Sequence, residues 1–268
     1  MMNPLRGLLA VVAGFAMIAS ISRPAGAGPV LYIDDANNRL GTVDVVTGAV
    51  NVIGNLNAGG EVITDIAFSP TGDLYGISFA SLFRIDATTA AATRVGALGK
   101  NLENALVFGA DGTLYASGGD GLLSRVNTST GLETTIGRIG FGSAGDLAFN
   151  GGSLYMSSTS DQLVRVNLTN GSGSAVGPLG FSGVFGLATG DNGVLYGVSG
   201  STILTINPAT GAGTTDLTYG GGLGVAYGTA FRSEAAAVVP EPSSIILGGI
   251  AGLIGLGYSS RRRRATAI

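Results

Sequence analysis

The sequence predicts an all-β protein built from repeated units of about 40 residues, and three observations support this fold class. First, Gly accounts for 47 of the 268 residues and lies among short runs rich in Val, Ile, Thr and Tyr, a composition that favours short strands and tight turns. Second, a Leu-Tyr pair recurs five times at intervals of 40 to 43 residues. Third, no stretch between the two chain ends has apolar residues spaced as on one face of a helix.

Each repeat carries the signals of four short antiparallel strands. The Leu-Tyr pair marks the second strand, and an apolar first strand and a turn precede every pair except the first. The third strand ends on Asp or Asn, whose side chain can bond the backbone two residues on, and a fourth strand follows that turn. Repeats of this kind predict the blades of a β-propeller. The pairs are Leu31-Tyr32, Leu74-Tyr75, Leu114-Tyr115, Leu154-Tyr155 and Leu195-Tyr196. The first strands span residues 65–68, 105–108, 146–149 and 186–189.

The phase of the repeat predicts that the ring closes on itself. The body begins with a second strand, residues 31–34, while a first strand with no Leu-Tyr pair after it stands alone at residues 224–227. Pairing these two segments completes a fifth blade and removes the exposed edges of an open array. We therefore predict a five-bladed β-propeller closed by a C-terminal strand. One position of the first strand holds small side chains that suit a crowded axis, namely Ala67, Val107, Ala148, Ala188 and Ala226.

Residues 1–27 have the pattern of a secretory signal peptide that contains a signal helix. Arg6 precedes an uncharged, mostly apolar run over residues 7–21, and Ala25 and Ala27 give the small-x-small pattern that signal peptidase requires. The run is shorter than the ~20 residues of a spanning helix, which disfavours the alternative of an N-terminal anchor. We expect cleavage after Ala27 and a propeller over residues 28–234.

Residues 235–268 carry three features in a fixed order. Pro240-Glu241-Pro242 comes first, an uncharged apolar run over residues 243–260 follows, and Arg261-Arg262-Arg263-Arg264 comes last. As a helix the run would be about 27 Å long, which predicts a transmembrane helix that just spans a thin bilayer. The arginines should keep its far end in the cytoplasm.

This order of features resembles the PEP-CTERM sorting signal of Gram-negative bacteria. The resemblance implies processing by an exosortase, a membrane transpeptidase, and delivery to the cell surface or to an exopolysaccharide matrix. A plain tail anchor would explain the helix and the arginines, but it gives no reason for the Pro-Glu-Pro motif. The expected partners are signal peptidase, an exosortase-type enzyme, the membrane before processing, and exopolysaccharide or surface proteins.

Missing residue types exclude several chemistries. The chain has no His and no Cys, so it lacks the commonest general base, the commonest metal ligand and any thiolate nucleophile or disulfide. Six of the 14 basic residues lie in the end segments, which leaves eight against 17 acidic residues and a net charge of about −9. Such a surface repels phosphate groups, so we expect no nucleic-acid partner.

Two carboxylates and an amide form a candidate metal site. Asp65 and Asp146 begin first strands and could face the axis together with Asn104, and oxygen ligands of this kind suit Ca²⁺. The alternative is that each carboxylate caps backbone N–H groups. Gly186 and Gly224, which we take as the equivalent residues of two other blades, supply no ligand atom.

Two further series recur once per blade. We expect the arginines to form exposed ion pairs, with a sugar-binding rim as the alternative, and the tyrosines to pack between blades. The arginines are Arg84, Arg125 and Arg165, and the tyrosines are Tyr32, Tyr75, Tyr115, Tyr155 and Tyr196.

From these observations we predict a non-enzymatic, exported surface or matrix protein that serves as a binding or structural module. This prediction assigns no catalytic residue, metal or cofactor. The alternative is a calcium-dependent propeller enzyme, such as a lactonase or hydrolase, that uses the axial channel.

Overall fold

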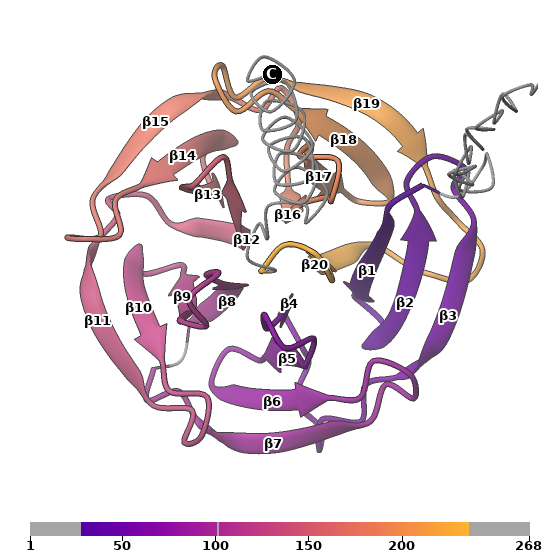
Figure 1. Cartoon of the computed structure of the whole chain (residues 1–268), viewed down its shortest axis with the longest axis horizontal. Helices are drawn as coiled ribbons and strands as arrows, with labels where there is room; N and C mark the ends of the chain where they lie inside the picture. The colour runs from indigo at the N-terminus through magenta and orange to yellow at the C-terminus, as the bar shows by residue number, and fades with distance from the viewer. Residues whose placement is uncertain (1–27, 101, 236–268) are drawn as a thin grey trace, which may run out of the picture.

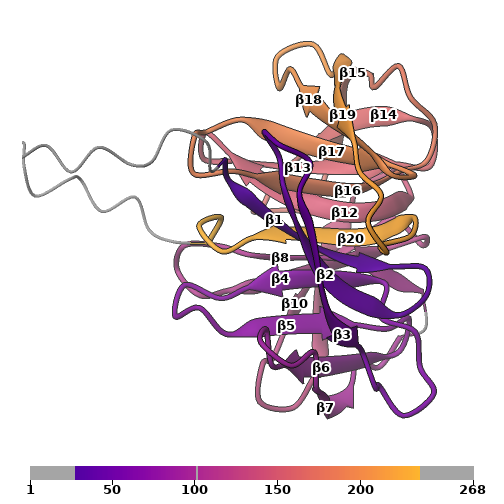
Figure 2. The same ribbon diagram turned by 90° about the vertical axis from the view of Figure 1, so that its right-hand side faces the viewer.

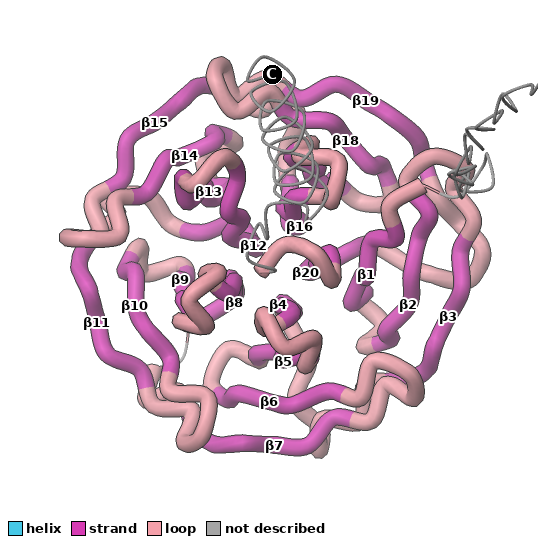
Figure 3. Tube along the Cα trace, in the orientation of Figure 1, coloured by secondary structure: helices cyan, strands magenta, loops and turns pink. Residues whose placement is uncertain are grey.

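The computed structural model describes residues 28–100 and 102–235, which form five four-stranded antiparallel sheets arranged as a ring (Figure 1). Every regular element in this part of the chain is a strand (Figure 3), and none of it is a helix able to cross a membrane. The prediction of an all-β, five-bladed propeller is confirmed. The predicted signal peptide, transmembrane helix, Pro-Glu-Pro motif and arginine cluster lie outside the described residues.

Each blade has four strands, ordered from the ring axis outward. Blade 1 contains β20 (Ala226–Phe231), β1 (Val30–Asp35), β2 (Arg39–Asp44) and β3 (Val50–Asn55). Blade 2 contains β4 (Asp65–Phe68), β5 (Leu74–Ile77), β6 (Ser81–Ile85) and β7 (Ala92–Ala97). Blade 3 contains β8 (Glu103–Phe108), β9 (Leu114–Gly118), β10 (Leu122–Val126) and β11 (Glu133–Arg138). Blade 4 contains β12 (Ser143–Asn150), β13 (Ser153–Ser158), β14 (Gln162–Val166) and β15 (Gly173–Pro178). Blade 5 contains β16 (Val184–Thr189), β17 (Leu195–Ser199), β18 (Thr202–Ile206) and β19 (Gly213–Thr218).

The C-terminal strand closes the ring, as the phase of the repeat predicts. Strand β20 pairs antiparallel with β1, so that Phe231 lies opposite Leu31 and Thr229 lies opposite Ile33. Blade 1 is therefore built from both ends of the described chain, and its inner strand, β20, is the last strand in the sequence.

The predicted position of this strand was wrong by four residues. Ala230, not Ala226, lies opposite Tyr32, as Ala67 lies opposite Tyr75 in blade 2. It follows that Gly228, not Gly224, is equivalent to Asp65. The sequence Gly-x-Ala occurs at both 224–226 and 228–230, and only the second copy is followed by the Phe that most inner strands share at this place.

Aromatic pairs join neighbouring blades, which confirms the packing role predicted for the tyrosines. The ring of a second-strand Tyr meets the ring of the inner-strand Phe in the next blade, at centroid distances that favour edge or tilted contact. The pairs are Tyr32–Phe68 at 4.8 Å, Tyr75–Phe108 at 5.4 Å, Tyr115–Phe149 at 5.9 Å and Tyr196–Phe231 at 5.4 Å.

Polar side chains at the outer turns act as the sequence predicts. Asp44 Oδ1 accepts hydrogen bonds from the N–H groups of Val46 (2.9 Å) and Thr47 (2.8 Å), and this fixes the turn after β2. In the arginine series, the predicted exposed ion pair is confirmed for Arg84, which pairs with Asp73 at 2.5 Å, and it stays a prediction for Arg125 and Arg165.

The inner strands run side by side along the ring axis and give the molecule two distinct faces (Figure 2). We call the face at which β4, β8, β12, β16 and β20 begin the mouth face, and the opposite one the terminal face. Strand β1 runs antiparallel to β20, so it begins where β20 ends. Both ends of the described chain therefore lie at the terminal face.

Candidate functional site

A β-bulge interrupts the inner strand of four blades close to the mouth face. At each one the pairing register with the second strand shifts, and an extra residue is left out of the ladder. Bulges bend a strand and redirect the extra side chain. The extra residues are Asn104 in β8, Phe185 in β16 and Tyr227 in β20, and in β12 the irregular segment contains Ala144, Gly145 and Asp146.

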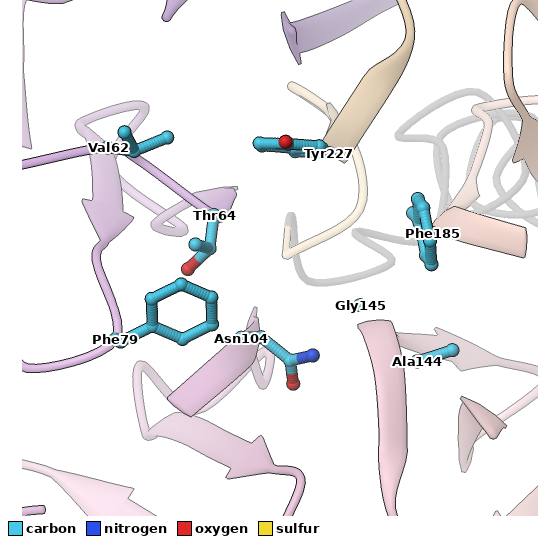
Figure 4. A pocket seen from close by; sticks show the side chains of 8 residues that line it. All are labelled: Val62, Thr64, Phe79, Asn104, Ala144, Gly145, Phe185 and Tyr227. Carbon is cyan, nitrogen blue, oxygen red and sulfur yellow. The ribbon is translucent and has the colours of Figure 1, made fainter. Parts of the chain in front are cut away.

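These redirected residues line a pocket on the ring axis, with a volume of about 390 Å³ (Figure 4). Its lining is Val62, Thr64, Phe79, Asn104, Ala144, Gly145, Phe185 and Tyr227. Five of these residues occupy one equivalent position of the repeat, directly before the residue equivalent to Asp65. The five are Thr64, Asn104, Gly145, Phe185 and Tyr227, a different residue in every blade. The turn and packing residues are thus similar in most blades, whereas the position that faces the pocket differs in every blade.

The pocket has an aromatic side and a polar side. Phe185 and Tyr227, from adjacent blades, turn the faces of their rings toward its middle, whereas Thr64 and Asn104 lie across from Phe185 with the ring of Phe79 beside them (Figure 4). Asn104 Nδ2 donates a hydrogen bond to the Ser143 carbonyl at 3.3 Å, while its Oδ1 accepts none from the described residues. None of the lining residues is charged. Such a pocket suits a neutral ligand with one apolar face.

Two fully buried carboxyl groups, those of Asp65 and Asp146, join neighbouring inner strands. Asp65 accepts a hydrogen bond from the N–H of Leu106 in the next blade. Asp146 Oδ2 accepts one from the N–H of Leu187 in the next blade at 2.6 Å, and two from Thr229 of the closing strand, from N–H at 3.2 Å and Oγ1 at 3.0 Å. The carboxyl groups therefore hold the inner strands together, and Asp146 also fixes β20.

A third carboxyl group, that of Asp34, is also fully buried, and its two oxygens form no hydrogen bond of normal geometry with the described residues. Gly228 of β20 lies against it, since a Cβ at that position would come within 2.6 Å of Asp34 Oδ1 and within 2.2 Å of Asp65 Oδ1. Burial raises the pKa of Asp34, Asp65 and Asp146 well above the usual range, and the charges of Asp146 and Asp34 raise the pKa of Asp65 further. The raised pKa values favour the protonated form of these three carboxyl groups.

The calcium site predicted from Asp65, Asn104 and Asp146 gains no support from this arrangement. The two carboxyl groups take the alternative role of capping backbone N–H groups, and the Asn104 amide belongs to the pocket lining. Within residues 28–100 and 102–235, no three His, Cys, Asp or Glu residues lie where they could hold a metal ion.

A second acidic cluster lies at the junction of blades 2 and 3, where no sequence motif pointed to one. The side chains of Glu103 and Glu133 are 1% and 2% exposed, and the Lys100 ammonium lies 3.9 Å from Glu103 Oε1 and 3.2 Å from Glu133 Oε2. The Lys100 ammonium thus lies within 4 Å of two buried carboxyl groups. Burial, followed by the charge of Glu133, raises the pKa of Glu103 to about 8.

We expect this carboxyl group to make the unfolding free energy fall as the pH rises. Glu103 keeps its proton in the folded chain up to about pH 8, whereas it ionises near pH 4.5 when unfolded, so folding is favoured on the acid side and loses up to about 5 kcal/mol between pH 4 and pH 9. Glu103→Gln, which stays neutral, should therefore match the wild type at pH 5 and melt at a higher temperature at pH 9. Asp216→Asn, at an exposed residue, serves as the control and should follow the wild type. Equal melting temperatures for wild type and Glu103→Gln at pH 9 would contradict the assignment.

Comparison with solved structures shows the propeller fold alone, because the structures named below are only 12% to 16% identical to this chain. A chain from a nidogen/laminin complex is 12% identical with a TM-score of 0.54, and the match covers 78% of this chain and 100% of that one. A protein of unknown function from Bacteroides thetaiotaomicron is 16% identical with a TM-score of 0.53, over 78% of this chain and 63% of that one. A proposed gluconolactonase is 16% identical with a TM-score of 0.51, over 73% and 82%. No curated protein matches the sequence.

The C-terminal segment gives the specific match. Residues 238–264 match the PEP-CTERM protein-sorting motif, and this range includes Pro240-Glu241-Pro242 and the four arginines from Arg261 to Arg264. The chain therefore carries a PEP-CTERM sorting motif directly behind a five-bladed β-propeller.

Proposed function

We propose that this chain is an exported binding protein of the cell envelope surface or matrix, released from its tail by an exosortase-type enzyme, with the axial pocket as its binding site. The observation that carries the proposal is the sorting motif at residues 238–264, because it supports an exported protein that passes through the membrane. The predicted signal peptide with Ala25 and Ala27 at its end agrees with export.

A non-enzymatic role is supported by the chemistry of the pocket. Its polar side chains are those of Thr64, Asn104 and Tyr227, and none of them has a neighbouring general base in the lining. The nearby carboxyl groups of Asp65 and Asp146 are occupied by backbone hydrogen bonds. Binding without turnover is the function that such a lining serves best.

The position of the chain ends supports outward display of the pocket. The described chain ends at Ala235 on the terminal face, five residues before Pro240. Five residues reach at most about 18 Å, so before processing the terminal face stays close to the membrane and the mouth face points away from it.

Mass spectrometry of the native protein from its host tests the proposal. We expect an N-terminus at Gly28 and a C-terminus close to Pro240-Glu241-Pro242, with no peptide from residues 265–268 in the surface fraction. Intact C-terminal peptides in that fraction would identify a plain anchor and overturn the proposal. The N-terminal peptide in the same spectra is the internal control for export.

A further inference from the structure

We infer that the axial pocket binds a neutral sugar residue of a polysaccharide, stacked on Phe185 and Tyr227. This inference deepens the proposed function and rests on it, since it names the class of ligand for the same pocket. It starts from the variation within the repeat, where the equivalent position holds Thr64, Asn104, Gly145, Phe185 and Tyr227. The position of the small axial residues, by contrast, holds Ala in four blades and Val in one.

The aromatic side of the pocket selects a ligand with a flat, weakly polar face. The ring faces of Phe185 and Tyr227 are turned toward the middle of the pocket (Figure 4). The face of an aromatic ring carries negative charge density, so it attracts C–H groups that neighbouring oxygen atoms polarise. The axial C–H groups on one side of a pyranose ring are of this kind. Gly145 leaves room beside Phe185, because a Cβ there would lie 2.7 Å from the Phe185 carbonyl oxygen.

The polar side of the pocket selects a ligand with hydroxyl groups on its edge. The Asn104 amide and the Thr64 hydroxyl lie across from Phe185, with the ring of Phe79 beside them (Figure 4). The Thr64 hydroxyl donates to the Ile77 carbonyl at 3.1 Å and can still accept, and Asn104 Nδ2 donates one hydrogen bond to Ser143 and has a second N–H to offer. The Tyr227 hydroxyl can both donate and accept. A sugar residue fits this division, because its hydroxyl groups project from the edge of the ring while its C–H groups cover the face.

Charge and exposure select a neutral unit of a polymer. No charged residue lines the pocket, so an acidic sugar would be desolvated without a counter-ion, and the net charge of the body opposes it as well. The volume of about 390 Å³ lies near the lower end of small-ligand pockets, which is enough for one or two sugar rings. Val62 and Phe79, which are 42% and 53% exposed at the rim, extend the apolar surface for neighbouring units.

Calorimetric titration of the exported protein, purified from its host, tests the inference. The probes are neutral oligosaccharides (hexasaccharides of glucose, mannose and galactose), an oligogalacturonate, and an apolar hexapeptide. We expect at least one neutral oligosaccharide to bind and the oligogalacturonate not to bind. Phe185→Leu and Tyr227→Leu, which keep apolar bulk but remove the aromatic faces, should each weaken binding roughly tenfold. Phe79→Ala, at an exposed and therefore tolerant position, should weaken it roughly threefold.

The control is Leu132→Ala, an apolar residue of similar exposure (58%) outside the pocket, and it should leave binding unchanged. Binding that Phe185→Leu and Tyr227→Leu leave intact, or no binding by any neutral oligosaccharide, would overturn the inference. Binding of the apolar peptide alone would also overturn it, and the proposed surface binding function would still stand. Failure of the proposed function has a separate readout, which is the unprocessed tail in the mass spectra.

Discussion

A chain that ends at Gly222 should not fold to a stable monomer, whereas a chain that ends at Ala235 should. The shorter chain lacks β20, the inner strand of blade 1, so β1 keeps an unpaired edge with Leu31 and Ile33 uncovered. An exposed apolar edge templates association with other chains. We expect aggregation or a fall of more than about 5 kcal/mol in unfolding free energy, a large part of the stability of a domain. Size-exclusion chromatography and thermal melting of the two chains measure this.

A single substitution tests the packing of β20 against its neighbouring strands. In Gly228→Val the new Cβ would lie 2.2 Å from Asp65 Oδ1 and 2.4 Å from Asp65 Cα, so the backbone of β20 must move away from β4. Gly119→Ala is the matched control, because a Cβ there meets no atom within 4 Å. A Gly228→Val protein that melts like the control would show that β20 is not packed against Asp65 as described.

Removing the Asp146 side chain should be the most damaging polar truncation in the ring. Asp146→Ala leaves the N–H groups of Leu187 and Thr229 unpaired in a fully buried place and breaks the link between blades 4, 5 and 1. Each unpaired buried donor costs about 1–3 kcal/mol, so we expect a loss of about 3–5 kcal/mol. Chemical denaturation at pH 6 and 25 °C is the measurement.

Asp34→Asn gives the matched contrast at the same axis. Asp34 is equally buried, but its oxygens form no hydrogen bond of normal geometry, and its charge adds to that of Asp65. Replacing it with a neutral side chain of the same size should stabilise the protein as the pH rises, because the raised pKa of Asp34 makes ionisation costly in the folded chain. Destabilisation by Asp34→Asn at pH 8, or a neutral effect of Asp146→Ala, would contradict these roles of the axial carboxyl groups.

The repeat made most of the fold predictable from sequence. Leu-Tyr pairs, Asx turns and the unpaired strands at the two ends determine the number of blades and their closure, because each signal recurs at a fixed spacing. The register of β20 was missed because Gly-x-Ala occurs twice in succession. Phe231 could have resolved it, since it occupies the place of Phe68, Phe108 and Phe149 and contacts Tyr196.

The pocket could not be predicted in the same way, because comparing repeats reveals what they share. Phe185 and Tyr227 occupy equivalent places, but they resemble neither Asn104 nor Gly145, and only the bulges direct them to the axis. Phe79 comes from the turn between β5 and β6, and the turns at this place in the other blades carry no aromatic residue. The cluster of Glu103, Glu133 and Lys100 was missed for a related reason, since it brings together the first residues of β8 and β11, 30 positions apart, and a residue between β7 and β8, which share no motif.

The central claim, an exported protein that displays its pocket outside the cell, is tested most directly by cysteine labelling of intact cells. The chain has no Cys, so a single substitution gives a single reactive site. Val62→Cys places a thiol at the rim of the pocket, and Val46→Cys places one at the turn after β2 on the terminal face, where the side chain is 67% exposed. We predict that a membrane-impermeant maleimide labels Val62→Cys on intact cells as fully as after lysis, with Val46→Cys as the comparison for the opposite face. Labelling of both variants only after the cells are broken open would contradict the claim.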